Sequence, residues 1–450
     1  MSLNIENVLQ KINKKYVNLK SSEMSKNKDL LNKILNKMLD LMKKDDLFKT
    51  LYETPYYGGS SYEGLKVEKP NEFDMDFLLV LPKVCETHKT ASCDCLEVIC
   101  SNKPGFFWFK MKNTFHKSFS KFINDDYVQT NLVLNWLQSL VRKALNEFSN
   151  MNYSVETPDI NSMSGPALVL KIDSEFGKIS VDLVLAFKFG SNYWPKQGYR
   201  QNLCSNQDFV IVPKKADIPD HGERYWRASF QAQEKELITG KGKLKPALRL
   251  LKKMRNNLKH DSISSYALKT IILWNLDTWN KNSTLTEVFL GLLREYKNHL
   301  LNGKIKYFWN EKYNLLDRIG SETLKNHANE IKKKIERFEK NKNEKPLEIA
   351  KIILKEGSEE YQQFMKKYEV YVTQSWGTNS NWDLPDNLYD DPDETNDSRN
   401  FEFPNSRTGM IQEDQTSNVN TAAAWIAGLA IVAVVGITVY RASRSTTNNR

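Results

Sequence analysis

The sequence predicts an α/β body that becomes helical toward its C-terminal side, followed by a disordered linker and a membrane-spanning helix. Three short apolar runs, at 77–81, 168–172 and 179–187, predict buried strands. Apolar residues then recur at helical spacing, which predicts helices over 231–256, 264–280, 284–299, 320–340 and 345–370. A chain of 450 residues with 40% hydrophobic residues is long enough for two or three domains.

Composition excludes several classes of protein. Charged residues at 27% and aromatic residues at 11% are not typical of a wholly disordered chain, a collagen or a polytopic membrane protein. Five cysteines in 450 residues argue against a disulfide-stapled secreted fold. The first residues lack the basic-then-apolar pattern of a secretory signal, so we expect the body to be made in the cytosol.

Charge is unevenly distributed along the chain. Residues 377–420 carry ten acidic and two basic side chains, whereas the net charge of the whole chain is +10. Because the last 30 residues contribute +3, residues 1–376 hold +15 by difference. A body this basic predicts a polyanionic partner, and the alternative is a solvated lysine-rich surface.

An amphipathic helix is expected at 28–44, and its exposed face would be basic. Its polar positions hold five lysines: Lys28, Lys33, Lys37, Lys43 and Lys44. The segment 56–61, which contains Gly58 and Gly59, is predicted to be a turn.

The C-terminal region predicts a linker and an anchor. Residues 377–420 have few aliphatic side chains and are expected to be disordered. Residues 422–440 carry no charge, and 19 residues of helix span roughly 28 Å, close to the apolar thickness of a bilayer. Trp425 and Tyr440 lie near the two ends, as interfacial aromatic residues do. We therefore expect a transmembrane helix at 421–441 and a short basic tail at 442–450.

The strongest chemical signal is a set of three carboxylates. Glu72 and Asp74 alternate with Phe73, so on a strand both would point to one face, about 7 Å apart. Asp182 is the acid within an apolar strand, where it is costly unless it is paired or liganded. Carboxylates suit Mg²⁺, and two such ions can hold the attacking and leaving oxygens of a phosphoryl transfer. For Glu72 and Asp74 alone, the alternative is a charge pair on an edge strand.

Ordered motifs resemble one enzyme family. They are Gly59-Ser60, Asn71-Glu72-Phe73-Asp74, Ser180-Val181-Asp182, Trp226-Arg227-Ala228-Ser229-Phe230 with Glu234-Lys235-Glu236, and Ser264-Ser265-Tyr266-Ala267-Leu268-Lys269-Thr270. Over roughly residues 20–375 the chain resembles cyclic GMP-AMP synthase and the animal receptors that are similar to it.

The resemblance implies a bilobed nucleotidyltransferase fold, in which a small mixed sheet with a long spine helix is followed by a helical C-lobe. It implies a core lobe at 1–230 and a helical lobe at 231–376. The implied activity joins ATP and GTP into a cyclic dinucleotide of the cyclic GMP-AMP type when a nucleic acid binds.

The resemblance also implies roles for individual residues. Glu72, Asp74 and Asp182 would be the catalytic ligands of two Mg²⁺ or Mn²⁺ ions. Nucleotide contacts would come from Gly59, Ser60, Asp182, Arg227, Ser229, Lys252, Ser265 and Tyr266. Lys252 would supply charge to the phosphates, and Tyr266 would supply a π-face to a base. Without the resemblance, Tyr266 could equally be core packing and Lys252 part of a solvated basic face.

The sequence departs from cyclic GMP-AMP synthase at its zinc thumb. The interval 237–263 contains His260 but no cysteine, so no zinc thumb is expected and DNA sensing is in doubt. The same interval carries Lys241, Lys243, Lys245 and Arg249, which would contact RNA. This pattern resembles the insect-type receptors and implies double-stranded RNA as ligand, gripped through its backbone and shape, with a homodimer forming on it.

A separate cysteine cluster contains Cys85, His88, Cys93, Cys95 and Cys100. These residue types suit Zn²⁺, but their spacing matches no established ligand pattern. Reduced cytosolic thiols are the alternative. Cys204 stands apart.

Two functions remain open at this stage. The first is an RNA-activated cyclic dinucleotide synthase of innate immunity, with a linear-product 2′-5′ oligoadenylate synthetase as its relative within the enzyme class. The second is a membrane-anchored adaptor that binds nucleotide without turnover, as in mitochondrial dynamics proteins. A C-terminal anchor at 421–441 predicts a body on the cytosolic face of the mitochondrial outer membrane or the endoplasmic reticulum.

Overall fold

The computed structural model describes residues 4–375, except 20, 68, 70, 83–95, 113–115, 149–152, 157–164, 176, 197, 220 and 344. All of these residues belong to one compact unit, Met1–Gly377. The predicted linker, anchor and tail, as well as Cys85, His88, Cys93 and Cys95, lie outside the described residues.

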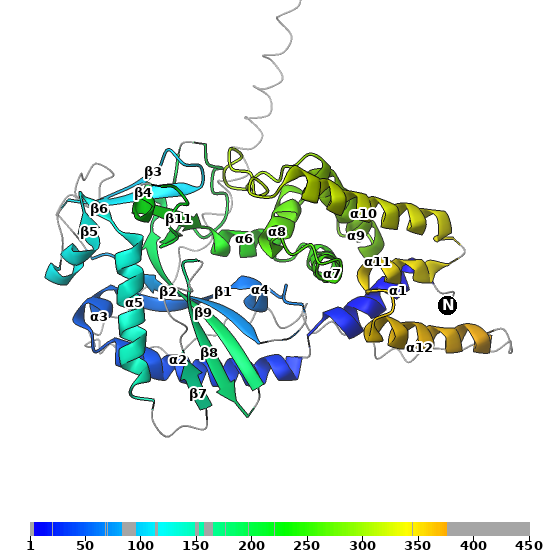
Figure 1. Ribbon diagram of the computed structural model, residues 1–450, viewed down its shortest axis with the longest axis horizontal. Helices are drawn as coiled ribbons and strands as arrows, with labels where there is room; N and C mark the ends of the chain where they lie inside the picture. Colours follow the sequence, from blue (N-terminus) through cyan, green and yellow to red (C-terminus); the bar gives the residue numbers. More distant parts are fainter. Residues whose placement is uncertain are drawn as a thin grey trace, which may run out of the picture. The chain divides into compact units, whose positions relative to one another are not determined.

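A mixed sheet forms the centre of the first part of the chain (Figure 1). Its described strands are β1 (Tyr52–Gly58), β2 (Glu72–Leu79), β3 (Leu96–Cys100), β4 (Phe106–Met111), β5 (Ile123–Asn124), β6 (Tyr127–Val128), β7 (Tyr153–Glu156), β8 (Leu168–Ser174), β9 (Gly177–Phe189), β10 (Phe209–Val212) and β11 (Tyr225–Ser229). The main path runs β1-β2-β9-β10-β11-β4-β6-β5, β3 pairs with β4, and β7 pairs with β8, which also pairs with β9. Strands β2 and β9 pair in parallel, whereas β1 and β8 flank them antiparallel.

The three predicted strands are confirmed, with different ends. The strand predicted at 77–81 begins at Glu72 and therefore includes the acidic residues. The predicted turn at 56–61 is wrong, because β1 continues to Gly58 and the short helix α4 (Gly59–Tyr62) follows directly. A positive φ of 68° at Gly59 makes this abrupt change of direction possible.

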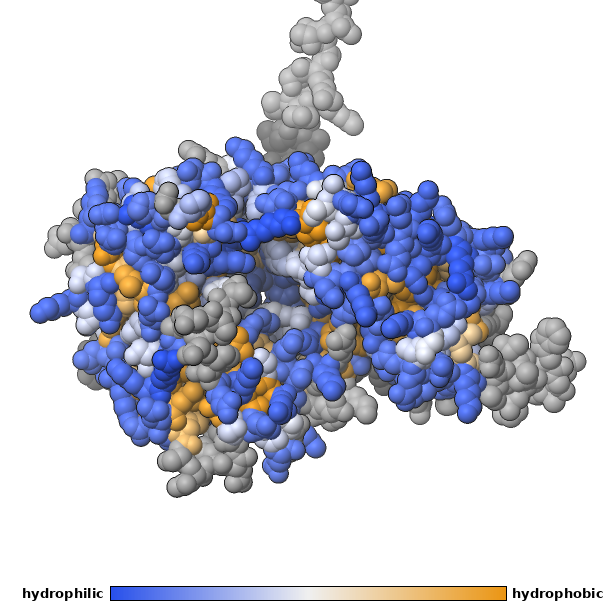
Figure 2. Space-filling view, viewed as in Figure 1, coloured by the Kyte–Doolittle hydropathy of each residue, from blue (hydrophilic) through white to orange (hydrophobic). Residues whose placement is uncertain are grey.

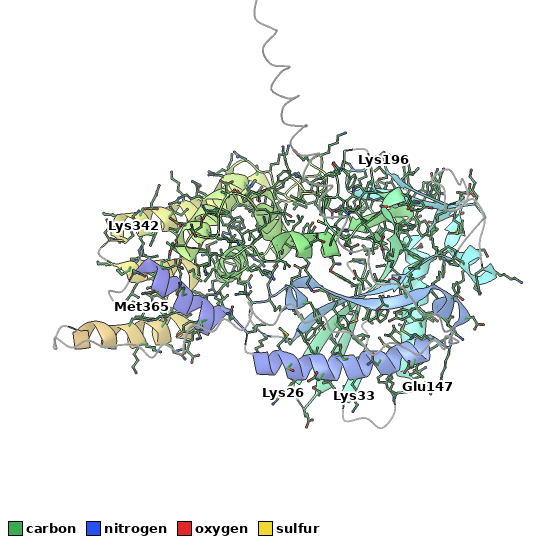
Figure 3. The ribbon with its side chains drawn as sticks, turned by 180° about the vertical axis from the view of Figure 1, so that it is seen from behind. Lys26, Lys33, Glu147, Lys196, Lys342 and Met365 are labelled. Carbon is green, nitrogen blue, oxygen red and sulfur yellow. The ribbon has the colours of Figure 1, made fainter. Side chains whose placement is uncertain are left out.

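The first helices connect the sheet to the helical part. Helix α1 (Ile5–Ile12) packs against α9 (Leu285–Leu301), and the Glu6 carboxylate accepts from the backbone N–H of Thr286 at 2.8 Å. Helix α2 (Ser21–Met42) contains most of the helix predicted at 28–44 and packs against α5 (Thr130–Leu145). Lys26 and Lys33 lie on its outer side (Figure 3). A short α3 (Asp46–Leu51) leads into β1. The boundary near residue 230 stays a prediction, and α1 packs with helices beyond it.

The C-terminal part is helical, as predicted. Its helices are α6 (Gln231–Ile238), α7 (Leu244–Asn257), α8 (Ser265–Trp274), α9, α10 (Ser321–Asn341), α11 (Ala350–Ile353) and α12 (Glu359–Ser375). The predictions at 284–299 and 320–340 are confirmed. A single helix over 231–256 is wrong, since Gly240 and Gly242 have φ of 72° and 54° and separate α6 from α7. The single helix predicted over 345–370 is also wrong, because a 3-10 helix (Pro346–Ile349) precedes α11 and Gly357, with φ of 82°, precedes α12.

The part of the chain that the structure describes contains no helix long and apolar enough to cross a membrane.

Candidate active site

The three predicted carboxylates meet at the start of the parallel strand pair. Asp74 of β2 and Asp182 of β9 are register partners, and Glu72 faces Ser180 two pairs earlier. Paired strands lie about 4.8 Å apart, and alternate residues share a face. The sheet therefore presents Glu72, Asp74 and Asp182 on one face, which the sequence predicted for the first two but could not fix for the third.

The three carboxylates repel one another, and burial together with this repulsion raises the pKa of two of them. Surrounding protein removes part of the hydration of Asp74 and raises its pKa, and the neighbouring charge of Asp182 raises it further. The pKa of Asp182 is likewise raised, first by burial and then by the charge of Glu72. Lys66, which pairs with Glu72, lowers both values. Carboxylates held together in this way gain free energy from a bound cation, so the residues fit a divalent metal.

Asp76 continues the acidic row deeper into the protein. It is 5% exposed and accepts from Gln231 Nε2 at 3.0 Å. Burial first, and then the charge of Asp74, raise its pKa to about 7. It is therefore set apart from the three solvent-facing carboxylates.

Helix α4 packs directly over these acids. A Cβ at Gly59 would overlap the Asp74 carboxylate, so glycine alone fits there. The Ser61 hydroxyl donates to the Glu72 carbonyl at 2.6 Å and ties the helix to β2. Helix α2 also contacts this region. The Tyr57 hydroxyl donates to the Asn32 side chain of α2 at 3.2 Å, and the Lys28 ammonium of α2 lies 4.8 Å from the centre of the Tyr62 ring of α4. Figure 2 shows a hollow near the middle of this face, where Figure 1 draws α4, β2, β9 and α6.

We expect Gly59→Ala to lower the nucleotide turnover that the sequence resemblance implies about 100-fold, because relieving the overlap displaces Asp74 or α4 by roughly 1 Å. Gly64→Ala is the matched control. It also has a positive φ, of 69°, but a Cβ there meets no atom within 4 Å. Both variants place a Cβ on a residue with positive φ, so their backbone strain is similar. Equal turnover in the two would contradict the proposed overlap between a Cβ at position 59 and the Asp74 side chain.

A cluster of cations lies beside the acids. The Lys252 ammonium is 5% exposed and donates to the Leu65 carbonyl at 2.7 Å. Burial lowers its pKa to about 8, and the charges of Lys66 and Arg255 contribute. Arg255 donates to Ser265 Oγ at 2.8 Å, at the N-terminus of α8. The predicted phosphate contacts Lys252 and Ser265 are thus brought together, and Lys66 and Arg255 were missed by the sequence reasoning.

The Arg227 side chain lies among aromatic rings. Its guanidinium carbon lies 4.4 Å from the centre of the Tyr313 ring and 5.3 Å from that of Tyr307. The ring of Tyr266 is 6.2 Å from that of Tyr307, so the predicted base contacts Arg227 and Tyr266 are near neighbours. Ser229 follows two residues after Arg227 on β11 and lies half-buried.

A buried group of charged side chains connects the part that contains the sheet to the helical part. The Lys269 ammonium, 8% exposed, lies 2.8 Å from a carboxylate oxygen of Glu63 and 3.0 Å from one of Glu234. Glu234 also accepts from Tyr266 at 2.6 Å and from Trp309 at 3.0 Å. The sequence reasoning assigned no role to this group. The sequence signal for this group was Lys269, a lone lysine in the apolar helix 265–274.

The predicted RNA residues separate into two environments. Lys241 and Lys243 are exposed on the turn between α6 and α7, Lys245 is half-buried, and Lys241 pairs with Asp277 at 3.1 Å. Arg249 instead is 6% exposed and donates to the Gly64 carbonyl at 2.7 Å. Arg249 is therefore buried against the segment that follows α4 and is not part of the exposed basic face.

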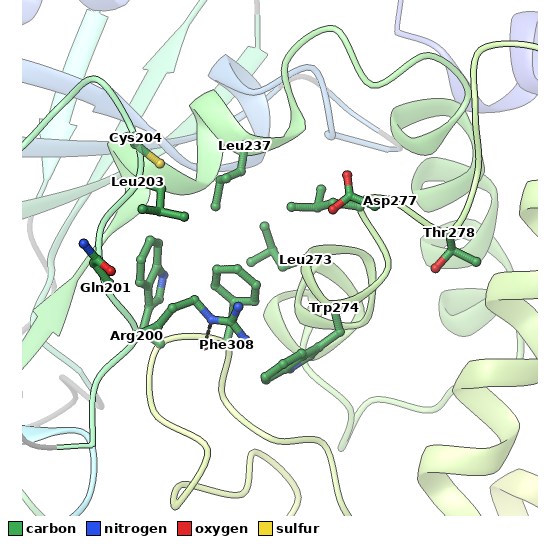
Figure 4. Close-up of a pocket in the computed structure, with 12 residues that line it drawn as sticks. Arg200, Gln201, Leu203, Cys204, Leu237, Leu273, Trp274, Asp277, Thr278 and Phe308 are labelled. Atoms are coloured by element: carbon green, nitrogen blue, oxygen red, sulfur yellow. Dashed lines mark hydrogen bonds between the residues drawn. The ribbon is translucent and has the colours of Figure 1, made fainter. Parts of the chain in front are cut away.

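A cavity of about 530 Å³ lies elsewhere and contains none of the predicted site residues (Figure 4). Arg200 stacks on two of its rings, at 4.6 Å from Trp274 and 4.3 Å from Phe308. Its Nε donates to the Phe308 carbonyl at 3.1 Å.

Comparison with known proteins agrees with this arrangement. Residues 61–240 match the Mab-21 protein nucleotidyltransferase domain, and residues 243–333 match the Mab-21 protein HhH/H2TH-like domain. A cyclic GMP-AMP synthase-like receptor of Aethina tumida is 38% identical over 375 residues, which cover 78% of this chain and 91% of the relative. The chain belongs to the cyclic GMP-AMP synthase-like receptor family.

Other members of the family match over similar lengths. The receptor of Tribolium castaneum is 37% identical, covering 81% of this chain and 95% of its own. That of Nicrophorus vespilloides is 32% identical, covering 73% and 91%. Glu72, Asp74, Asp182, Lys66 and Arg227 therefore lie within the residues that match the nucleotidyltransferase domain. The residues that match the HhH/H2TH-like domain contain Lys252, Arg255, Tyr307 and Tyr313.

Proposed function

We propose that this protein is a nucleic-acid-activated nucleotidyltransferase that joins ATP and GTP into a cyclic dinucleotide of the cyclic GMP-AMP type. The observation that carries the proposal is the register of Asp74 with Asp182, beside Glu72 and under Gly59. Two Mg²⁺ or Mn²⁺ ions held by these carboxylates would supply charge neutralisation for phosphoryl transfer.

The chain's own residues have distinct tasks in this proposal. Lys66, Lys252 and Arg255 crowd positive charge beside Ser265, and an incoming polyphosphate relieves that crowding. Gly59 and Ser60 begin α4, where Gly59 lies against Asp74, and metal ions held by the acids would bind the phosphates there. Tyr266, Arg227 and Ser229 would contact the bases.

Product analysis tests the proposal. The purified chain is incubated with ATP, GTP, Mn²⁺ and duplex RNA, and the products are separated by chromatography and identified by mass. We expect a cyclic dinucleotide that depends on both nucleotides. Linear oligonucleotides would indicate the oligoadenylate synthetase type, and nucleotide binding without turnover would indicate the adaptor function. Either result would overturn the proposal.

Duplex RNA is the proposed ligand, and its proposed contacts are the exposed Lys241 and Lys243 of the α6–α7 turn and the half-buried Lys245 at the start of α7. Charge reversal of Lys241, Lys243 and Lys245 should weaken binding and activation together. Three lost phosphate contacts should reduce the log–log salt slope by roughly 3, using about 0.9 per contact for duplex DNA as a guide. Titrations at several salt concentrations measure this slope.

A control of equal charge change is available on α10, where Lys325, Lys332 and Lys333 are exposed. Reversing these three should leave most of the RNA affinity. Equal losses in the two triple variants would mean that net charge alone governs binding. Activity independent of any polyanion would contradict the sensor function.

We also propose that residues 421–441 anchor the chain in the mitochondrial outer membrane or the endoplasmic reticulum, with the body in the cytosol. The uncharged run 422–440 supports this proposal. Deleting 421–450 should move the protein from the membrane fraction to the soluble fraction, while protease added to intact organelles should remove the body. A full-length chain that stays soluble, or an unchanged location after the deletion, would contradict it.

A further inference from the structure

Two imidazoles and a carboxylate gather in the helical part, in a group that the proposed activity does not use. One ligand atom each from His260, His327 and Glu330 lies within 4.8 Å of the others. His260 is fully buried in the connection between α7 and α8, whereas His327 and Glu330 belong to α10. The group therefore joins two segments that lie 67 and 70 residues apart in sequence.

The backbone holds His260 firmly in place. Lys259, with φ of 55°, lies two residues beyond the last residue of α7, and the His260 N–H donates to the Arg255 carbonyl at 3.1 Å. Its Nδ1 lies 3.2 Å from the Tyr296 hydroxyl, and its Nε2 lies 3.1 Å from Glu330 Oε2. In the tautomer with the proton on Nδ1, the ring donates to Tyr296 and turns the Nε2 lone pair toward the carboxylate. Metal-binding histidines are usually oriented by such a second hydrogen bond.

The spacing also fits a metal ion. Two ligands at about 2.0–2.1 Å from a tetrahedral zinc lie roughly 3.3 Å apart, close to the 3.1 Å between His260 Nε2 and Glu330 Oε2. His327 and Glu330 are three residues apart on α10, so they share one face of the helix. The His327 ring stacks on that of His260 with centres 3.8 Å and planes 29° apart, so the His327 side chain has to rotate before its nitrogen lone pair and that of His260 meet at one ion.

The residue types favour zinc. A neutral imidazole offers a nitrogen lone pair to a metal ion. Glu330 supplies a negative charge, and the charge of Asp261 also reaches His327. Two nitrogens and one carboxylate oxygen select zinc over magnesium, which prefers oxygen ligands alone.

We propose that His260, His327 and Glu330 bind one Zn²⁺ ion, with water completing the coordination. The ion fastens α10 to the segment that leads into Ser264, the N-cap of α8. Its role is structural, because it stabilises the helical part and holds the start of α8. It differs from a cysteine-containing zinc thumb in its residues, because it combines His260 of the interval 237–263 with two side chains of α10.

Metal content and thermal unfolding of the full-length chain test this proposal. After zinc loading and dialysis, His327→Asn and Glu330→Gln should each hold one zinc per chain fewer than the wild type. Saturating zinc should raise the unfolding midpoint of the wild type by on the order of 5 °C at about 100 times Kd, and that of the variants much less. Comparing variants with the wild type cancels any zinc bound by cysteines or by the active-site acids.

His299→Asn is the control, because His299 is a half-buried histidine of the same part, outside the proposed group and bonded to the Lys304 carbonyl at 2.8 Å. It should bind as much zinc as the wild type. Glu330→Gln keeps the size of the side chain, so its folding without zinc can be compared directly. Equal zinc content in the wild type and both variants, or a wild type that retains no zinc, would overturn the proposal.

Discussion

Replacing Asp182 with asparagine should lower nucleotide turnover about a thousandfold or more. The amide keeps the size of the side chain but removes a negative charge from the group that would hold two divalent ions. Metal ions contribute several kcal/mol to such a transfer, and each 1.36 kcal/mol is a factor of ten in rate. Steady-state product formation with ATP, GTP and Mn²⁺ measures the effect. Asp74→Asn should behave in the same way, because the two residues are register partners.

Stability separates this loss from misfolding. Removing the Asp182 charge relieves repulsion with Glu72 and Asp74, so the thermal midpoint without metal should stay the same or rise. Asp173→Asn is the control, since Asp173 lies exposed on β8 of the same sheet. It should retain wild-type turnover. Wild-type turnover in Asp182→Asn would refute the assignment of the acids.

The second large effect concerns folding stability. Lys269→Met should lower the free energy of unfolding by about 3–5 kcal/mol, because it leaves Glu63 and Glu234 buried without their cation. Denaturant titration followed by fluorescence measures this change. Glu63 follows α4 and Glu234 lies on α6, so the variant should also weaken nucleotide binding by loosening α4.

Lys325→Met provides the comparison, since it removes an exposed lysine from α10 and should change stability by no more than about 0.5 kcal/mol. Adding Glu63→Gln and Glu234→Gln to Lys269→Met should recover part of the loss, because no uncompensated charge then remains buried. A Lys269→Met variant as stable as Lys325→Met would show that the ion group contributes little.

The parts of the site that follow from local rules could be predicted from sequence. Strand alternation places Glu72 and Asp74 on one face, and an acid in an apolar run identifies Asp182. The same rule applies to Lys269 in α8, but its partners Glu234 and Glu63 lie 35 and 206 residues away in sequence. Periodicity in the sequence does not indicate pairings between distant segments, so Glu63 and Glu234 became evident as the partners of Lys269 only in the folded chain.

Helical charge patterns were harder to interpret. Arg249 shares its helix with Lys245, Lys252, Lys253 and Arg255, which suggest a solvated face in the sequence although each of them is buried or half-buried in the fold. Arg249 itself donates to the Gly64 carbonyl. The end of α6 depends on two glycines with positive φ, whose conformation the apolar pattern does not reveal. The group of His260, His327 and Glu330 combines distant segments for the same reason that the Lys269 group does.

A crystal structure with Mn²⁺ and a non-hydrolysable ATP analogue would test the central claim most directly. Anomalous scattering locates manganese independently of any interpretation of the surrounding density. We expect two peaks about 3.5–4 Å apart, bound by Glu72, Asp74 and Asp182, with the triphosphate reaching toward Lys252 and Ser265. A triphosphate bound elsewhere, or carboxylates that bind no manganese at saturating concentration, would contradict it.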